Sequence, residues 1–264
     1  MSESACRTAI LISGSGSNLQ SFIDRTAEGR SALDLAVVFS NQPDAYGLTR
    51  AREAGIDTVC VEHGDFESRE AFDRAVAAKL DHWQPQLLIL AGFMRILSPW
   101  LVQHYEGRIL NIHPALLPLY PGLDTHQRVL DAGDEYHGST VHFVTEELDG
   151  GPRILQGCLS VAPTTDPQEL MSRVQAVEHQ IYPTAAEWFG QGRLKFRDGA
   201  AWLDGRRLDE PEVEAAIRHS VLNDLRVADR EMHLHAWIKR LKLANHARQD
   251  EFPQGETRAD QQRP

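Results

Sequence analysis

Residues 86–114, QLLILAGFMRILSPWLVQHYEGRILNIHP, decide the fold. Apolar runs at 86–93 and 108–114 flank a segment at 98–107 that has helical spacing, starts with a serine and ends with a glycine. Both runs are apolar on both faces, which is typical of parallel strands covered by helices on both sides. The stretch therefore predicts a strand, a helix and a second strand of a parallel sheet.

The same alternation extends toward the amino terminus. Apolar runs that predict strands lie at 8–14, 33–41 and 57–62. Amphipathic segments that predict helices lie at 17–29, 45–55 and 68–83. Strict alternation predicts an α/β fold with a mostly parallel, Rossmann-like sheet and helices on both faces.

Beyond residue 114 the pattern changes. A proline-rich loop, a short helix, two strands and an edge hairpin are expected at 114–122, 124–133, 138–162 and 194–208. Between the strands and the hairpin, a helix is expected to begin at Asp166 as its N-cap. Pro167 suits the first helical position, and Glu169 completes a capping-box pattern.

From residue 211 the sequence is polar and helical in pattern, with a single apolar stripe formed by Leu234, Trp237, Ile238 and Leu241. The last dozen residues have the composition of a disordered segment. We expect a domain at 1–210 and a helical C-terminal extension at 211–264 with a disordered end. Packing of the stripe on the domain is the first expectation, and a second subunit or another partner are the alternatives.

Composition excludes several classes of protein. The chain has 264 residues, 42% of them hydrophobic, and a formal net charge of -11, with the acidic excess in residues 1–210, which argues against nucleic acid as the main ligand. The three cysteines lack metal-ligand spacing, so we expect free thiols and no metal. No apolar run has the length of a membrane span, and we expect a cytoplasmic protein.

A glycine loop follows the first predicted strand. Gly14 and Gly16 resemble part of a dinucleotide fingerprint, but Leu19 stands where its third glycine belongs, and the second strand ends in FSNQ without an acidic residue. The loop suits a single phosphate better, because Ser17 and Asn18 add donors to a helix N-terminus. A tight turn without a ligand is the alternative.

Asn111 and His113 share one face at the carboxyl end of a predicted strand. A carboxylate beside the imidazole favours its charged form, and Asp149, Glu146 and Glu147 are the candidates, between which composition does not choose. An imidazolium and an amide aimed at one point stabilise an oxyanion, which suits attack on a carbonyl carbon. No nucleophile motif is evident, so we expect direct transfer between two bound substrates.

Five stretches together resemble the phosphoribosylglycinamide formyltransferases, folate-dependent enzymes of purine synthesis. They are SGSGSNLQ (13–20), SNQPDAYGLTRAREAG (40–55), LAGFMRILSPWLVQHYEGRILNIHPALLPLYPGLDTH (90–126), HGSTVHFVTEELDGGPRILQ (137–156) and VEHQIYP (177–183). The match is colinear from about residue 8 to about residue 210. The resemblance implies a formyltransferase-type fold and transfer of the formyl group of 10-formyltetrahydrofolate to the amine of glycinamide ribonucleotide.

The resemblance also implies roles for single residues. Asn111 holds the formyl oxygen, His113 stabilises the oxyanion and relays a proton, and Asp149 orients and tunes His113. The ribonucleotide is held by Gly16, Ser17, Asn18, Gln175 and Glu178. The folate is held by Arg69, Met94, Arg95, Ile96, Leu97, Asn111, Thr145, Glu146, Glu147, Leu148 and Asp149.

Further expectations concern the polar pair on the predicted helix, two histidines and the alternative functions. Gln175 and Glu178 are expected on one helix face, opposite Val174 and Val177. His126 and His142 lie close to the motif and are expected to be structural, and a place in the wall of the cleft is the alternative for each. Alternative functions are a formyltetrahydrofolate deformylase, which passes the formyl group to water, and a non-catalytic phosphate- or folate-binding protein of the same fold. The partners expected are the two small molecules, without nucleic acid, membrane or metal, in a monomer or homodimer.

Overall fold

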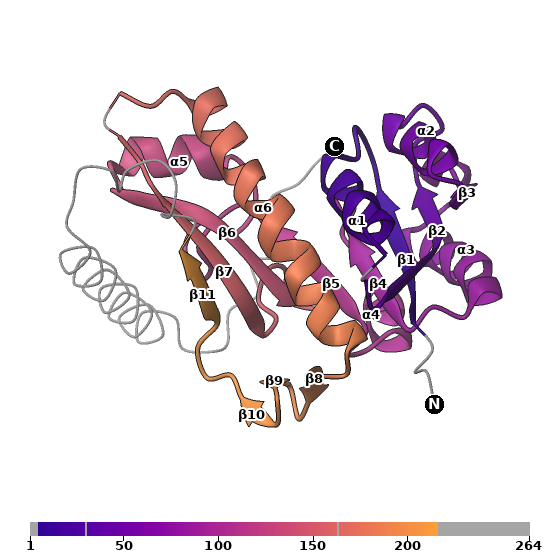
Figure 1. Cartoon of the computed structure of the whole chain (residues 1–264). Helices are drawn as coiled ribbons and strands as arrows, with labels where there is room; N and C mark the ends of the chain where they lie inside the picture. Colours follow the sequence, from indigo (N-terminus) through magenta and orange to yellow (C-terminus); the bar gives the residue numbers. More distant parts are fainter. Residues whose placement is uncertain (1–4, 30, 163, 216–264) are drawn as a thin grey trace. The chain divides into compact units, whose positions relative to one another are not determined.

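A computed structural model describes residues 5–29, 31–162 and 164–215 (Figure 1). The helices are α1 (Ser17–Ala27), α2 (Tyr46–Glu53), α3 (Arg69–Leu80), α4 (Pro99–His104), α5 (Thr125–Ala132) and α6 (Pro167–Gly190), with 3-10 turns η1 (His63–Asp65) and η2 (Asp81–Trp83). The strands of the main sheet are β1 (Cys6–Ile12), β2 (Leu33–Ser40), β3 (Asp57–Cys60), β4 (Leu87–Leu90), β5 (Ile109–His113), β6 (Tyr136–Phe143), β7 (Arg153–Ser160) and β11 (Glu212–Ala215).

The predicted alternation of strands and helices is confirmed. The sheet order is β11-β7-β6-β5-β4-β1-β2-β3, and β1 to β5 pair in parallel. Because β1 lies between β2 and β4, the chain runs outward to one side through α1 and α2 and returns to the other side through α3. Open α/β sheets bind ligands at the carboxyl ends of the strands beside such a reversal.

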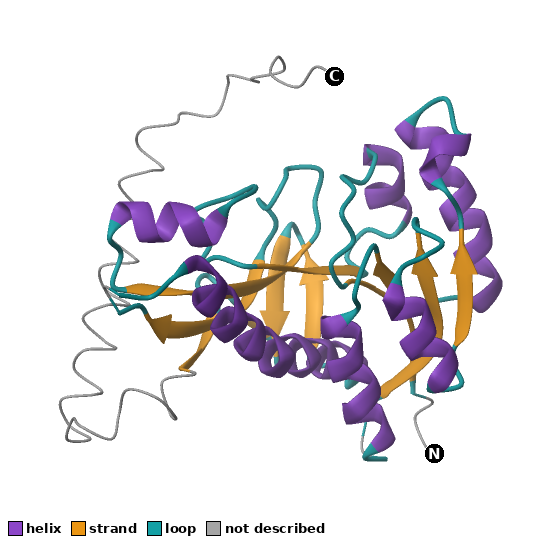
Figure 2. Cartoon of the chain, turned by 90° about the horizontal axis from the view of Figure 1, so that it is seen from above, coloured by secondary structure: helices purple, strands orange, loops and turns teal. Residues whose placement is uncertain are grey.

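Helices cover both faces of the sheet, as Figure 2 shows. Buried side chains of α1, α2 and α6, such as Phe22, Leu48 and Ile181, pack against one face in a single apolar cluster. Side chains of α3 and α4, such as Phe72 and Leu101, form a second cluster on the other face. This double covering explains why the strands are apolar on both sides.

The carboxyl half of the sheet is built differently. β6 is antiparallel to both β5 and β7, while β11 runs parallel to β7. Residues 212–215 were expected to begin a helix, and that expectation is wrong, since the open edge of β7 offers unpaired backbone groups that a further strand can use. The stripe at 234–241 and the expected disordered end lie outside the described residues.

The segment at 194–208 is more than the expected edge hairpin. It forms β8 (Leu194–Arg197), β9 (Ala200–Leu203) and β10 (Arg206–Arg207), which pair in a separate antiparallel sheet. The ring of Phe196 packs edge-on against Phe143 at 5.3 Å between ring centroids. This aromatic contact holds the small sheet on the end of β6.

The long helix α6 begins as predicted. The side chain of Asp166 accepts hydrogen bonds from the backbone N–H groups of Gln168 and Glu169, both at 2.9 Å, and Pro167 occupies the first turn. The carboxylate of Glu169 lies 3.9 Å from Arg173 in an ion pair. In the part of the chain that is described, no helix has the length and apolarity needed to cross a membrane.

Candidate active site

The glycine loop between β1 and α1 passes closely over the first turn of α2. Gly16 has a left-handed conformation with φ 70°, and a Cβ placed there would lie 2.7 Å from the Cα of Gly47. The N–H of Gly47 also donates to the carbonyl oxygen of Gly14 at 3.0 Å. Gly16 is therefore needed for the turn itself, and the turn leaves the N-terminus of α1 facing the carboxyl edge of the sheet.

The N-terminus of α1 meets the middle of α6. Nε2 of Gln175 donates to the hydroxyl of Ser17 at 2.7 Å, and Nδ2 of Asn18 donates to Glu178 Oε2 at 2.9 Å. Oδ1 of Asn18 is buried and has no hydrogen-bond partner among the described residues, so it remains available to a ligand donor. The sequence predictions of a helix-terminus anion site and of a polar pair on α6 thus fall in one place.

Glu178 does not face away from the core. Val174, Val177 and Glu178 are all buried, and Gln175 is half-buried, so the expectation of opposite faces is wrong. At about 100° per residue, position 178 falls between positions 174 and 175 on the helix surface. Glu178 is thereby carried inward beside Val174.

The end of β5 presents Asn111 toward His142 on the neighbouring strand. Nδ2 of Asn111 lies 3.1 Å from Nε2 of His142, and Nδ1 of His142 lies 2.9 Å from the carbonyl oxygen of Phe143. Burial lowers the pKa of His142 to about 4, so the ring is neutral at pH 7. His142 is therefore part of the site's geometry rather than a purely structural side chain.

The imidazole of His113 lies between two acceptors. Its Nδ1 is 3.5 Å from Asp149 Oδ2, and its Nε2 is 2.9 Å from the carbonyl oxygen of Tyr120. The same carboxylate oxygen accepts a hydrogen bond from the N–H of Gly122 at 2.9 Å. The side chains of His113 and Asp149 are each only 7% exposed. A charged imidazole in this arrangement would donate from Nε2 to the carbonyl oxygen of Tyr120 and attract the Asp149 carboxylate on the side of Nδ1.

Geometry distinguishes the three candidate carboxylates. Glu146 and Glu147 are exposed, and Glu146 accepts a hydrogen bond from Gln103 at 2.8 Å. Asp149 alone of the three is turned toward His113, at a residue with a positive φ of 54°. Gly151 lets the turn close, because a Cβ there would lie 1.8 Å from the carbonyl oxygen of Phe143. The two glycines after Asp149 thus mark a sharp return, as predicted.

The predicted folate-binding segment at 94–97 lies beside the glycine loop. The backbone N–H of Met94 donates to the hydroxyl of Ser13 at 2.8 Å, and that hydroxyl donates to Asn41 at 2.6 Å. Met94 is 78% exposed and Ile96 is 47% exposed, whereas Leu97 is buried. Leu148, in the turn before Asp149, is 57% exposed. Exposed apolar side chains at a site edge offer contact to a planar aromatic ligand.

The sequence does not predict Asp73 as a residue of the site. Asp73 is 1% exposed and accepts a hydrogen bond from the N–H of Ser98 at 2.5 Å. Burial raises the pKa of Asp73, while hydrogen bonds from Ser98 and the charges of Arg95 and Arg69 lower it. Asp73 therefore lies close enough to the two arginines predicted to hold folate for their charges to act on its carboxyl group. Its position one residue after Phe72, on the inward side of an amphipathic helix, was the available signal.

A histidine pair also went unrecognised. Nδ1 of His126 lies 3.0 Å from Nε2 of His137, which is 1% exposed. Burial lowers the pKa values of both rings, that of His137 to about 3. The pair is neutral and hydrogen-bonded, which agrees with the structural role expected for His126. Among the described residues, no group of three or more His, Cys, Asp or Glu side chains is arranged to hold a metal ion.

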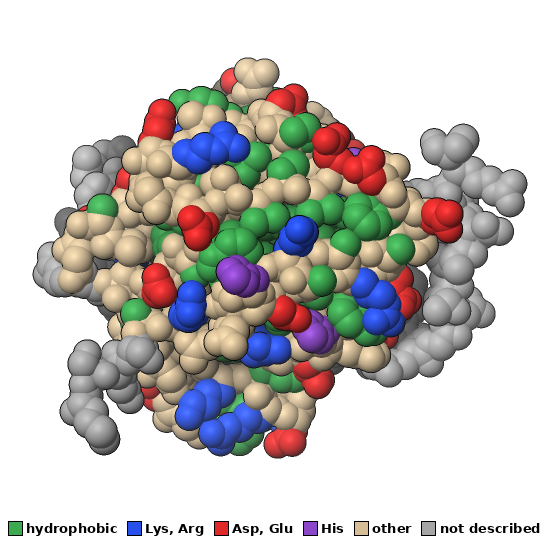
Figure 3. All heavy atoms as spheres, turned by 90° about the vertical axis from the view of Figure 1, so that its right-hand side faces the viewer, with side chains coloured by type: hydrophobic (Ala, Val, Ile, Leu, Met, Phe, Trp, Pro, Cys, Tyr) green, Lys and Arg blue, Asp and Glu red, His purple; other side chains and the backbone are tan. Residues whose placement is uncertain are grey.

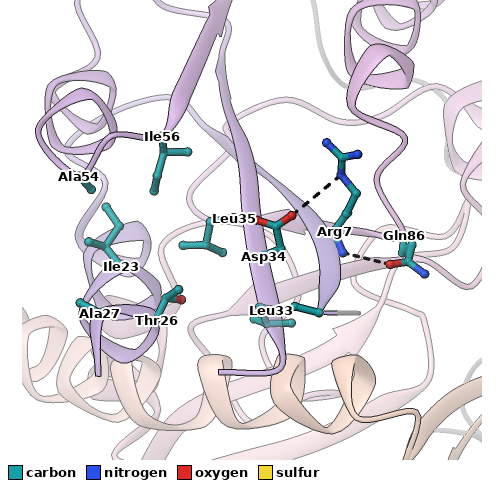
Figure 4. A pocket seen from close by; sticks show the side chains of 11 residues that line it. Arg7, Ile23, Thr26, Ala27, Leu33, Asp34, Leu35, Ala54, Ile56 and Gln86 are labelled. Atoms are coloured by element: carbon teal, nitrogen blue, oxygen red, sulfur yellow. Dashed lines mark hydrogen bonds and ion pairs between the residues drawn. The ribbon is translucent and has the colours of Figure 1, made fainter. Parts of the chain in front are cut away.

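A hollow of about 750 Å³ lies away from this site, at the amino ends of β1 and β2 (Figure 4). Its walls are mainly apolar, with Ile23, Leu35 and Ile56, and Arg7 lies 4.0 Å from Asp34 at its rim. None of the predicted site residues lines it. The polar constellation at the opposite edge of the sheet is therefore the better candidate for chemistry.

Comparison with known proteins agrees with the fold and the motifs. The model of the formyl transferase family matches residues 6–186. The phosphoribosylglycinamide formyltransferase of Escherichia coli (strain K12) is 54% identical over 199 residues, which cover 75% of this chain and 94% of that protein.

Solved structures give the same result. The phosphoribosylglycinamide formyltransferase of Coxiella burnetii superimposes with a TM-score of 0.76 at 45% identity, covering 79% of this chain and 98% of that chain. Glycinamide ribonucleotide transformylase 1 from Symbiobacterium toebii has a TM-score of 0.74 at 42% identity and covers 76% and 95%. The chain belongs to the formyl transferase family, and within it to the phosphoribosylglycinamide formyltransferases.

Proposed function

We propose that this protein transfers the formyl group of 10-formyltetrahydrofolate to the amine of glycinamide ribonucleotide, giving formylglycinamide ribonucleotide in de novo purine synthesis. The observation that carries the proposal is the convergence of Asn111, His113 and Asp149 at the carboxyl edge of β5. A protein that only bound phosphate or folate would have no need of this set, which suits stabilisation of an oxyanion.

In the proposed reaction the amine nitrogen attacks the formyl carbon, and negative charge develops on the formyl oxygen. Asn111 uses one Nδ2 hydrogen for His142, which leaves the second for that oxygen. His113 supplies the other donor, and Asp149 balances its positive charge. The Nε2–H of His113 is held by the carbonyl oxygen of Tyr120, so that carbonyl must give way when the formyl oxygen is engaged.

Protons and bonds balance without a protein nucleophile. A bond forms between the amine nitrogen and the formyl carbon, and the bond from that carbon to N10 of the folate breaks. The amine gives up one proton and N10 gains one, a transfer for which His113 is the proposed carrier. Asp149 keeps the imidazole in place between these positions. The catalytic contribution of the protein is therefore positioning, charge and the transfer of this proton.

The two substrates are assigned to neighbouring subsites. Gly16, Ser17 and Asn18 at the N-terminus of α1 would hold the phosphate, and Gln175 and Glu178 would complete this subsite. The folate would lie against the segments 94–97 and 145–149. Exposed Met94, Ile96 and Leu148 support contact with its ring system. The guanidinium of Arg69 suits the glutamate carboxylates of its tail.

One face of the molecule shows how acidic and basic side chains are distributed on it. On the face at the β3 edge, acidic and basic side chains are interspersed, and no continuous basic stripe crosses it (Figure 3). Nucleic-acid binding requires such a stripe. A monomer or homodimer in the cytoplasm is the setting that we propose for this reaction.

Release of deformylated folate, followed by absorbance with and without glycinamide ribonucleotide, tests the proposal. Release should require the ribonucleotide, and the formylated product should be found by mass spectrometry. Equal release without the ribonucleotide would mean that water accepts the formyl group, and the deformylase alternative would replace the transferase. No release under either condition would favour the binding protein.

A further inference from the structure

Ser139 connects the two halves of the site. It lies in β6, is fully buried, and its hydroxyl is 2.7 Å from the carbonyl oxygen of His113 and 3.1 Å from Glu178 Oε1. Glu178 Oε2 accepts a hydrogen bond from Asn18 at the start of α1. A single hydroxyl thus touches both the backbone of the proposed catalytic histidine and the carboxyl group of the proposed phosphate subsite.

Counting hydrogens decides the direction of these bonds. A serine hydroxyl has one hydrogen but faces two oxygens that accept. At 2.7 Å, the contact with the His113 carbonyl is too short for two oxygens without a hydrogen between them, so Ser139 donates there. The 3.1 Å contact with Glu178 then has a hydrogen of its own only if the carboxyl group is protonated and donates to the hydroxyl.

The surroundings of Glu178 agree with a neutral acid. Within the described residues its side-chain hydrogen bonds go to Asn18 and Ser139, neither of which carries a charge. Burial raises the pKa of Glu178 and outweighs the hydrogen bonds that join its carboxyl group to Asn18 and Ser139. Tyr182 on the same helix is neutral, since burial raises the pKa of its phenol, and its hydroxyl faces the carbonyl oxygens of Leu90 and Leu110.

We propose that Ser139 is a positioning residue whose hydroxyl accepts a hydrogen bond from a protonated Glu178 and donates one to the carbonyl oxygen of His113. This relay ties the phosphate subsite to the strand end that carries the imidazole. It also keeps a negative charge away from a subsite proposed for a phosphate dianion, where an ionised Glu178 would repel the ligand.

Difference infrared spectroscopy of the ligand-free protein tests the relay without relying on the proposed function. At neutral pH, wild type should show the carbonyl stretch of a protonated carboxyl group that is missing in Glu178→Gln. In Ser139→Ala this band should shift, because the acid loses its acceptor, and Ser139→Thr, which keeps a hydroxyl, should restore it. If the alanine variant does not fold, Ser139→Cys replaces it, since a thiol is a weak acceptor.

Thr140→Val is the matched control, because it removes the next buried hydroxyl of β6, which bonds the carbonyl of Ala115 at 2.6 Å and does not contact Glu178. In Thr140→Val the carbonyl stretch assigned to protonated Glu178 should lie at the same frequency as in wild type. Absence of a protonated-carboxyl band assignable to Glu178 would overturn the proposal, as would an unshifted band in the folded Ser139→Ala or Ser139→Cys variant.

A kinetic measurement adds the link to substrate, and this arm rests on the proposed function. KM for glycinamide ribonucleotide should rise in alkaline solution as Glu178 ionises, while KM for the folate stays level. Loss of the acceptor at Ser139 destabilises the neutral acid, so in Ser139→Ala the rise should begin about half to one pH unit lower. If KM for glycinamide ribonucleotide in Ser139→Ala instead begins to rise at a higher pH than in wild type, Ser139 donates to an ionised Glu178. That result would overturn the relay.

Discussion

Nδ2 of Asn111 donates a hydrogen bond to Nε2 of His142 across 3.1 Å, and this contact fixes the orientation of the amide. The carbonyl oxygen of Phe143 accepts from Nδ1 of His142, so Nε2 carries a lone pair and only the amino end of Asn111 can face it. The amide then presents its second N–H, rather than its oxygen, to a substrate oxygen.

Replacing His142 by Phe should therefore lower kcat about tenfold, because the loss of one neutral hydrogen bond lets the amide rotate. His142→Gln offers an amide oxygen as acceptor and should lose less. Steady-state kinetics with both substrates will measure this, and KM for glycinamide ribonucleotide should stay near that of wild type. A folded His142→Phe protein with wild-type kcat would show that the amide is held by other means.

His113→Ala should reduce turnover by on the order of 10²-fold or more, because the imidazolium is one of two donors proposed for the developing oxyanion. His113 is buried, and removing its ring leaves a cavity that also lowers stability. The free energy of unfolding must therefore be measured beside kcat. Near-wild-type turnover would contradict the catalytic assignment.

Asp149→Asn keeps the size of the side chain but removes the charge that faces His113. Without the carboxylate, the ring of His113 loses the charge that orients it and that balances a positive charge developing on it, so kcat should fall. Glu147→Gln, which alters an exposed carboxylate in the same loop, should have a much smaller effect. Steady-state kinetics will measure kcat, and equal kcat values for Asp149→Asn and wild type would reject this pairing.

Asp73→Ala should affect folate binding and stability together. It leaves the buried N–H of Ser98 without its acceptor, a loss of about 1–3 kcal/mol in the free energy of unfolding. It also frees the segment 94–97, so KM for the folate should rise while KM for the ribonucleotide does not. Asp73→Asn retains an acceptor oxygen and should recover much of the stability. Urea unfolding will measure the loss of stability, and steady-state kinetics will measure KM for each substrate. Equal changes in both KM values would argue against a folate-specific role for Asp73.

How far sequence predicts this site depends on whether the signal is local. Short stretches of sequence predict the strand that ends at His113 and the sharp turn around Asp149. The structure contains both features. The burial of Glu178 is not local, since its partner Asn18 lies 160 residues away. Helical periodicity places a residue on the helix surface, but a polar partner from another element determines whether it can be buried.

Contacts between distant segments also determine the structure of residues 212–215 and the burial of Asp73. The composition after residue 211 favours helix, yet residues 212–215 pair with β7, because a free strand edge overrides a weak local preference. Asp73 was passed over because a single acid in an amphipathic helix is normally solvent-exposed. The N–H of Ser98 that holds it inside comes from another segment. Contacts of this kind become visible only once the fold is assembled.

The buried histidine His137 should make the protein sensitive to acid. Its pKa is lowered from 6.5 to about 3 in the folded state, mainly by burial, so between these values the unfolded chain binds the extra proton. Stability from this group is present above pH 6.5 and is lost as the pH falls, by about 1.4 kcal/mol per unit. The pKa of His142 is also lowered by burial, to about 4. This second histidine therefore also contributes stability above pH 6.5 that is lost as the pH falls.

Urea unfolding at several pH values between 7 and 4.5 will measure the effect. His137→Gln can still hydrogen-bond to His126 but no longer titrates, so its free energy of unfolding should be lower at pH 7 and should fall less steeply on acidification. The two curves should approach each other as the pH falls. Parallel curves for wild type and His137→Gln would mean that the acid sensitivity comes from other groups.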